Sequence, residues 1–281
     1  MSRGLLVLRA NLILMAAIAS PALAADSSPW DGSSRAAIRL IEGAARETHG
    51  VTLYRAGIEM RLASGWKTYW RYPGDSGIPP RFDFSASRNV KAVIVHWPAP
   101  QRIADETGTS IGYKHDIVLP LEVVPQVAGE PVSLSLNIDY AVCEKLCVPA
   151  EGKAELTLSG QGGEQDGKIA QSEALVPLVT PLGGKGPLAI QSATRDTSSA
   201  RPRVLVDIAA PADATVELFA EGPAADWALP VPAPVAGAPS GLQRFAFELD
   251  GLPPDAKAQG AMLTLTAVAG AQAIEVAFRL D

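Results

Sequence analysis

The chain has 281 residues, with 24 basic and 30 acidic side chains and a formal net charge of −6 at pH 7. This acidic balance argues against nucleic acid or an anionic membrane surface as the partner. Hydrophobic residues make up 47% of the chain, its 25 Gly and 23 Pro are typical of a turn-rich β protein, and its length suits two domains of ordinary size.

Residues 1–24 have the features of a secretory signal peptide. Arg3 and Arg9 border an apolar stretch, and Pro21-Ala-Leu-Ala24 fits the small-x-small pattern that signal peptidase cleaves. The apolar stretch is shorter than the roughly 20 residues that a membrane-spanning helix needs. We therefore expect cleavage after Ala24 and an exported protein that is not inserted in a membrane.

Short runs of alternating polar and apolar residues follow the signal peptide. The runs 58–62 and 132–138 alternate strictly, which predicts two half-buried strands. The segment 35–46 fits either a helix or a strand, and we favour a strand. Further strands are expected at 51–55, 67–71, 90–96, 116–122 and 153–158.

Cys143 and Cys147 are the two cysteines of the chain, with three residues between them. In an extended strand, Cα atoms four residues apart lie about 13 Å from each other, whereas a disulfide requires roughly 7 Å or less. A bond between these cysteines therefore requires a tight turn or a single helical turn, and Pro149 blocks a continuing helix. Because so small a ring adds only about 2 kcal/mol of stability, we favour a reversible dithiol. A passive structural disulfide is the alternative.

A polar, glycine-bearing stretch at 159–167 marks a boundary between two halves. A short helix is expected near 168–176, and alternation resumes around Val204, Phe245 and Ile274. These patterns predict an all-β protein with two antiparallel β-sandwich domains. The expected divisions are the signal peptide at 1–24, a first domain at 25–162, a linker at 163–186 and a second domain at 187–281. The second domain has no Cys and no His, so we expect it to support or dock the first.

An aromatic-rich run at 65–80 and the cysteine-bearing segment 140–151 lead to a family resemblance. Together with Trp97-Pro-Ala-Pro100 and Gly112-Tyr113, they resemble the periplasmic N-terminal domain of the thiol:disulfide interchange protein DsbD, in the longer form of its ScsB relatives. The resemblance covers roughly residues 30–160. It implies a periplasmic, immunoglobulin-like sandwich whose cysteine pair receives electrons and passes them to oxidised, thioredoxin-like proteins.

The resemblance assigns roles to both cysteines and to a cap loop. Cys147 is expected to contact the partner and Cys143 to resolve the mixed disulfide. The cap loop falls at 105–113, where Asp105 and Glu106 match the acidic pair of the family.

The bulky aromatic residue that follows this acidic pair in the family is replaced here by Thr107-Gly108. We therefore expect Tyr113, Tyr69 or Trp66 to take its place in shielding the sulfurs and docking the partner.

The resemblance also implies partners. The membrane conduit and the C-terminal thioredoxin domain of full-length family members have no counterpart in this sequence, so a separate membrane thiol reductase is the expected electron donor. The favoured activity is that of a thiol-disulfide oxidoreductase, a protein-disulfide reductase that needs no cofactor and no metal.

Copper binding is the competing hypothesis, because two cysteine thiolates are soft ligands suited to Cu(I). His96 or His115 would complete a three-coordinate site. A third hypothesis is a non-catalytic module whose disulfide only locks a loop.

Overall fold

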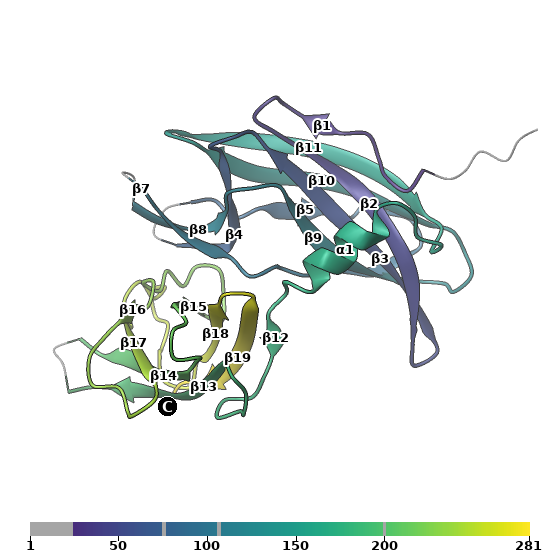
Figure 1. The fold of residues 1–281 in the computed structure, drawn as a ribbon. Helices are drawn as coiled ribbons and strands as arrows, with labels where there is room; N and C mark the ends of the chain where they lie inside the picture. Colours follow the sequence, from purple (N-terminus) through teal and green to yellow (C-terminus); the bar gives the residue numbers. More distant parts are fainter. Residues whose placement is uncertain (1–24, 75–76, 106–107, 199–200) are drawn as a thin grey trace, which may run out of the picture.

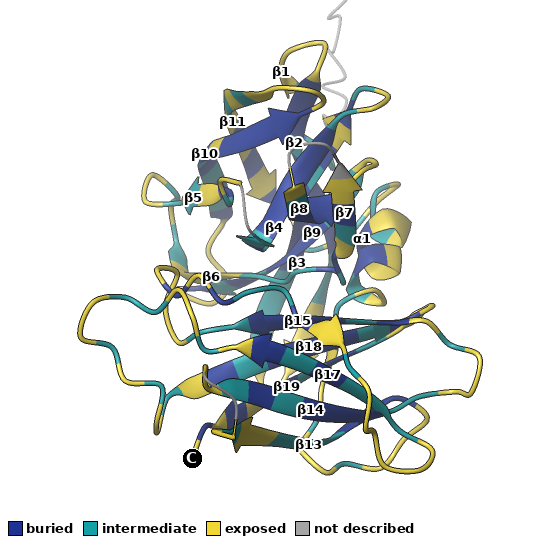
Figure 2. Ribbon diagram, turned by 90° about the vertical axis from the view of Figure 1, so that its left-hand side faces the viewer, coloured by how far each residue is buried: buried dark blue, intermediate teal, exposed yellow. Residues whose placement is uncertain are grey.

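The computed structural model describes residues 25–74, 77–105, 108–198 and 201–281, so the predicted signal peptide lies outside the described residues. Figure 1 shows two β-rich halves connected by a short helix and an extended segment. Figure 2 shows the halves stacked on each other, with buried residues concentrated in the strands and exposed residues in the loops. The predicted all-β class is confirmed. Within the part of the chain that the structure describes, no helix has the length and apolarity to cross a membrane.

The first half is an immunoglobulin-like sandwich of two antiparallel sheets. One sheet contains, in spatial order, β1 (Asp31–Gly32), β2 (Ala36–Thr48), β3 (Val51–Leu62), β9 (Ile117–Pro125) and β6 (Val90–Val95). The facing sheet contains β11 (Cys147–Leu158), β10 (Val132–Cys143), β4 (Lys67–Gly74), β8 (Gly108–Tyr113) and β7 (Gln101–Asp105), with β5 (Arg81–Asp83) beside β10. Every strand predicted for this half is present, although the runs 51–55 and 58–62 form one continuous strand.

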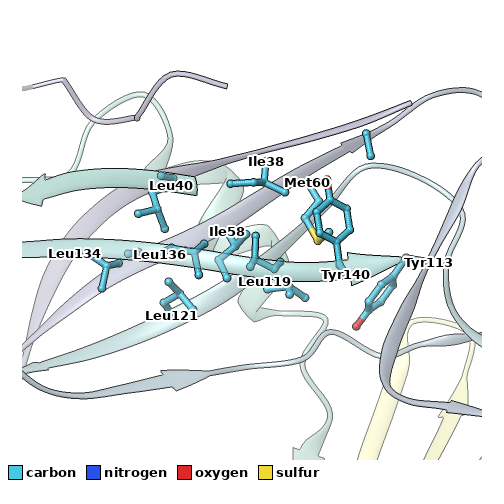
Figure 3. Packing of buried hydrophobic residues seen from close by; sticks show 14 of the residues in the cluster. Ile38, Leu40, Ile58, Met60, Tyr113, Leu119, Leu121, Leu134, Leu136 and Tyr140 are labelled. Atoms are coloured by element: carbon cyan, nitrogen blue, oxygen red, sulfur yellow. The ribbon is translucent and has the colours of Figure 1, made fainter. Parts of the chain in front are cut away.

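Alternate strand residues fill the core of this sandwich. The side chains of Leu134 and Leu136 in β10 and of Ile58 and Met60 in β3 are almost fully buried, while the alternating serines of β10 are half-buried. Figure 3 shows these side chains clustered between the strands. The alternation read from the sequence therefore marks the core-facing side of each strand correctly.

The second half is another sandwich of two four-stranded sheets. One sheet contains β12 (Leu178–Val179), β19 (Gln272–Arg279), β18 (Met262–Ala269) and β15 (Val216–Glu221). The other contains β13 (Ala189–Asp196), β14 (Arg203–Ala209), β17 (Gln243–Glu248) and β16 (Ala233–Pro234). Its pairings are antiparallel, as predicted, except that the short β12 runs parallel to β19.

The connection between the halves is attached to both of them. Helix α1 (Asp166–Glu173) forms where a short helix was expected and buries Ile169 against the first half. Arg55 of β3 forms ion pairs with Glu173 and Asp166, and these bonds raise the pKa of Arg55 despite its burial. The chain then continues into β12, which pairs with the second half. The segment predicted as a linker is thus held at both ends.

Candidate active site

The two cysteines lie opposite each other at the end of a β-hairpin. Strands β10 and β11 pair in continuous register from Val132–Leu158 to Cys143–Cys147, and the cysteines form a disulfide with Cα atoms 4.1 Å apart. Residues 144–146 make the turn between them. Of the two geometries that the spacing allowed, the structure therefore contains the tight turn.

Both hairpin strands are longer than the sequence pattern indicated, and Pro149 lies inside β11. Pro149 is paired with Ala141, and β11 is the outer strand of its sheet. An edge strand tolerates a residue that lacks an N–H group. The strand therefore begins at Cys147, whereas the alternation alone suggested a start near residue 153.

The environments of the two sulfurs differ. Cys143 is 2% exposed and packs with Ala141 and Tyr69, whereas Cys147 is exposed. Leu146, the neighbour of Cys147 in the turn, is 79% exposed. An attacking thiol can therefore reach Cys147, while Cys143 is protected by the sheet.

Tyr69 is the side chain that links the two sulfurs. Its hydroxyl oxygen lies 2.9 Å from Sγ of Cys143 and 3.1 Å from Sγ of Cys147, and its ring is buried. Because a disulfide sulfur carries no proton, the tyrosine hydroxyl is the donor in this state. When the disulfide opens, the same O–H group can donate to the thiolate that forms, and hydrogen bonds to charged acceptors are the stronger kind. Of the three aromatic residues expected near the sulfurs, the structure places Tyr69 against them.

The other two aromatic residues contribute to packing. Tyr113 is buried in the first-half core, where its hydroxyl donates to the carbonyl of Pro98 at 2.8 Å, and burial raises its pKa well above the ordinary value. Figure 3 shows Tyr113 at the margin of the core, near Tyr140. Trp66 is half-buried against the same core, with the guanidinium of Arg35 5.5 Å from its ring centre.

The predicted cap loop, residues 105–113, is mostly a strand, because residues 108–113 form β8, which pairs with β7 in a hairpin. Its strand β8 pairs with β4 at Thr68 and Tyr69, so the hairpin lies beside the strand that carries the tyrosine. Asp105 ends β7 as the register partner of Gly108. The Asp105 side chain and Glu106 lie outside the described residues, so the acidic pair of the cap stays a prediction.

Lys67 is a neighbour of the disulfide that the sequence reasoning did not select. It is the register partner of Cys143, is buried, and donates from Nζ to Oγ of Ser110 at 3.0 Å. Lys67 and Tyr69 are two residues apart on one strand and therefore share a face. This two-residue spacing from Tyr69 is the feature of the sequence that could have identified Lys67 as a site residue. A cation near the cysteine pair favours the thiolate form.

The histidines of the copper hypothesis lie in different places. His115 lines a shallow pocket with Lys67 and Glu144, whereas His96 lines another pocket with Arg55. Neither pocket is lined by a cysteine. Among the described residues, no group of three or more His, Cys, Asp or Glu side chains has an arrangement that could hold a metal ion.

Reducing the disulfide is expected to leave the fold intact. The bond spans only four positions in sequence, so its loss costs about 2 kcal/mol against a domain stability of about 5 to 15 kcal/mol. The melting temperature should fall by about 4 to 8 °C. Circular dichroism melts with and without a mild reductant measure the shift, and complete unfolding on reduction would instead support a structural disulfide.

Comparisons with known proteins agree with this site. The family model described as the thiol:disulfide interchange protein DsbD, N-terminal, matches residues 46–159. The crystal structure of the N-terminal periplasmic domain of ScsB from Proteus mirabilis has a similar fold, with a TM-score of 0.69 and 18% sequence identity over 91% of this chain and 98% of that chain. No curated protein matches the sequence significantly. The matched segment contains both cysteines, Tyr69 and strands β7 and β8. The match of residues 46–159 to the model of DsbD N-terminal domains confirms the resemblance that the motifs of this segment predicted.

Proposed function

We propose that the protein is a periplasmic thiol:disulfide interchange protein that passes electrons through the Cys143/Cys147 dithiol. The electrons come from a separate membrane thiol reductase and go to oxidised thioredoxin-like proteins. The observation that carries this proposal is the pairing of an exposed cysteine, Cys147, with a buried one, Cys143, whose sulfurs both lie within hydrogen-bond distance of the Tyr69 hydroxyl. The domain that does this comprises residues 25–162, and residues 187–281 form a supporting domain after the linker 163–186.

The exchange proceeds in two displacement steps. The Cys147 thiolate attacks a sulfur of the partner's disulfide, so that a mixed disulfide forms and one partner sulfur leaves as a thiolate. The Cys143 thiolate then attacks Sγ of Cys147, which restores the Cys143–Cys147 disulfide and releases the second partner sulfur. Two electrons and two protons move to the partner, and the membrane reductase replaces them.

The Tyr69 hydroxyl supports both steps from one position. Because it lies within hydrogen-bond distance of each sulfur, it can donate to whichever one carries the negative charge. Lys67, beside Cys143 in the sheet, adds positive charge to the same region.

The test is electron transfer between purified proteins. The reduced protein is mixed with an oxidised thioredoxin-like protein, and free thiols on each are counted by alkylation and mass spectrometry. We expect the partner to become reduced as the Cys143–Cys147 disulfide forms, and the Cys147→Ser variant to show no transfer. Absence of transfer, together with stoichiometric Cu(I) that resists a competing chelator, would favour the copper hypothesis. Absence of both would favour the structural disulfide.

A further inference from the structure

The strand that carries Tyr69 also carries several contacts between the halves. The Trp70 ring lies 5.9 Å from the ring of Phe219 in β15, and the Tyr72 hydroxyl donates to the carbonyl of Leu229. Between them, Arg71 forms ion pairs with carboxylates of the second half. Three consecutive residues after Tyr69 are therefore bound to the other sandwich.

The backbone of the same segment has few sheet partners. The register between β4 and β8 runs through Tyr69, is interrupted, and resumes only at Gly74. On its other side, β4 pairs with β10 only at Lys67 and Thr68. The position of residues 70–73 thus depends on their side-chain contacts rather than on a continuous ladder of strand hydrogen bonds.

Arg71 makes the most specific of these contacts. Its Nε and Nη2 bind the two carboxylate oxygens of Glu221 at 2.8 and 2.7 Å, and Nη2 also bonds to Glu275. Its guanidinium carbon lies 4.4 Å from the centre of the Trp70 ring. Burial disfavours the cation, but the bonds to Glu221 and then Glu275 outweigh it and raise the pKa of Arg71. A bidentate, partly buried ion pair of this kind fixes the orientation of the guanidinium as well as its distance from the carboxylate.

We propose that Arg71 is a positioning residue through which the second half holds β4, and thereby keeps the Tyr69 hydroxyl at the two sulfurs. The inference rests on the proposed exchange function, and it gives the second sandwich a defined task in it. Arg71 and Tyr69 are two residues apart on one strand, so a shift of the Arg71 backbone moves Tyr69 directly. The first half alone lacks the carboxylates of Glu221 and Glu275.

The consequence is measurable in the reduced protein. A hydroxyl that donates to a thiolate lowers the pKa of that thiol. Tyr69→Phe removes this donor and should raise the pKa by about one unit, which is a roughly tenfold loss of thiolate at a pH below both values. Arg71→Gln removes the cation and the bidentate contact while keeping a polar side chain, so it should shift the pKa in the same direction by part of that amount.

The experiment follows the alkylation rate of each cysteine against pH in the reduced full-length protein, with iodoacetamide as the probe and mass spectrometry to separate the two sites. The matched control is Arg102→Gln, because Arg102 of β7 also crosses to the second half, where it donates to the carbonyls of Pro232 and Leu218. We expect Arg71→Gln to raise the pH midpoint of the alkylation rate. Arg71→Lys should raise this midpoint less, and Arg102→Gln should leave it unchanged. In the Tyr69→Phe background, Arg71→Gln should cause no further shift of this midpoint.

An unchanged midpoint in Arg71→Gln, an equal shift in Arg102→Gln, or an additional shift on top of Tyr69→Phe would overturn the proposal. If Arg71→Gln fails to fold, the paired Glu221→Gln and Glu275→Gln changes test the same contact from the other side. The small reagent keeps this test separate from the proposed function, since thiol pKa values are measured whether or not a protein partner is reduced.

Discussion

The Cys143→Ser variant is expected to trap a covalent complex with a thioredoxin-like protein through Cys147. Cys147 is exposed at the end of the hairpin, so its thiolate can attack the partner's disulfide. The variant lacks the buried thiol that would resolve the mixed disulfide, so the complex should persist. Non-reducing gels show the complex, and mass spectrometry of its peptides identifies the linked cysteine.

The reciprocal variant is the control for this trap. Cys147→Ser leaves only the sulfur that is 2% exposed, and little adduct should accumulate. A predominant adduct through Cys143 would reverse the two roles. If neither variant forms an adduct, the exchange mechanism itself is wrong.

Phe219→Ala is expected to lower the free energy of unfolding by about 3 to 5 kcal/mol, the usual cost of emptying a buried phenylalanine site. Phe219 belongs to the second half by sequence, yet its side chain is fully buried in the hydrophobic cluster of the first half, beside Trp70. The cavity should therefore weaken both sandwiches. Urea unfolding gives the magnitude, and hydrogen exchange followed by mass spectrometry shows which strands are affected.

Phe247→Ala is the matched control, because Phe247 is buried in the separate cluster of the second half. Its removal should increase exchange in the second sandwich and leave β4 unaffected. Phe219→Ala should increase exchange in β4 and β15 together. If Phe219→Ala affects only second-half strands, the shared packing between the halves has been overestimated.

Local patterns predicted the parts of this molecule that depend on neighbouring residues. The alternation at 132–138 identified the core side of β10, and the cysteine spacing required a turn. The strand expected at 153–158 begins earlier, at Cys147, and includes Pro149. A proline is accepted there because β11 is outermost in its sheet, and the sequence alone does not show which strand is outermost.

The contacts between the halves could not be predicted in this way. Phe219 interrupts the alternation of its own strand, because it lies on the same face as Glu217 and Glu221. That pattern does not show that it packs with Trp70, about 150 residues earlier in the chain. Likewise, the sequence around Arg71 does not indicate that its partners are Glu221 and Glu275. The aromatic run around Tyr69 did predict a tyrosine or tryptophan near the sulfurs. However, the contact of the Tyr69 hydroxyl with both sulfurs depends on how β4 and β10 are placed side by side.

The outer position of β11 also limits how a partner can approach. Unpaired edge strands invite another chain to add itself to the sheet, and prolines and outward charges are the usual deterrents. Here Pro149 offers no N–H group, Glu151 and Glu155 are exposed, and the backbone N–H of Lys153 is bonded to the Asp31 carboxylate at 2.7 Å. The edge next to the exposed sulfur is thus a poor template for strand addition or for self-aggregation. For the proposed exchange function, we therefore expect a redox partner to bind at the turn itself, where only three residues separate the two cysteines.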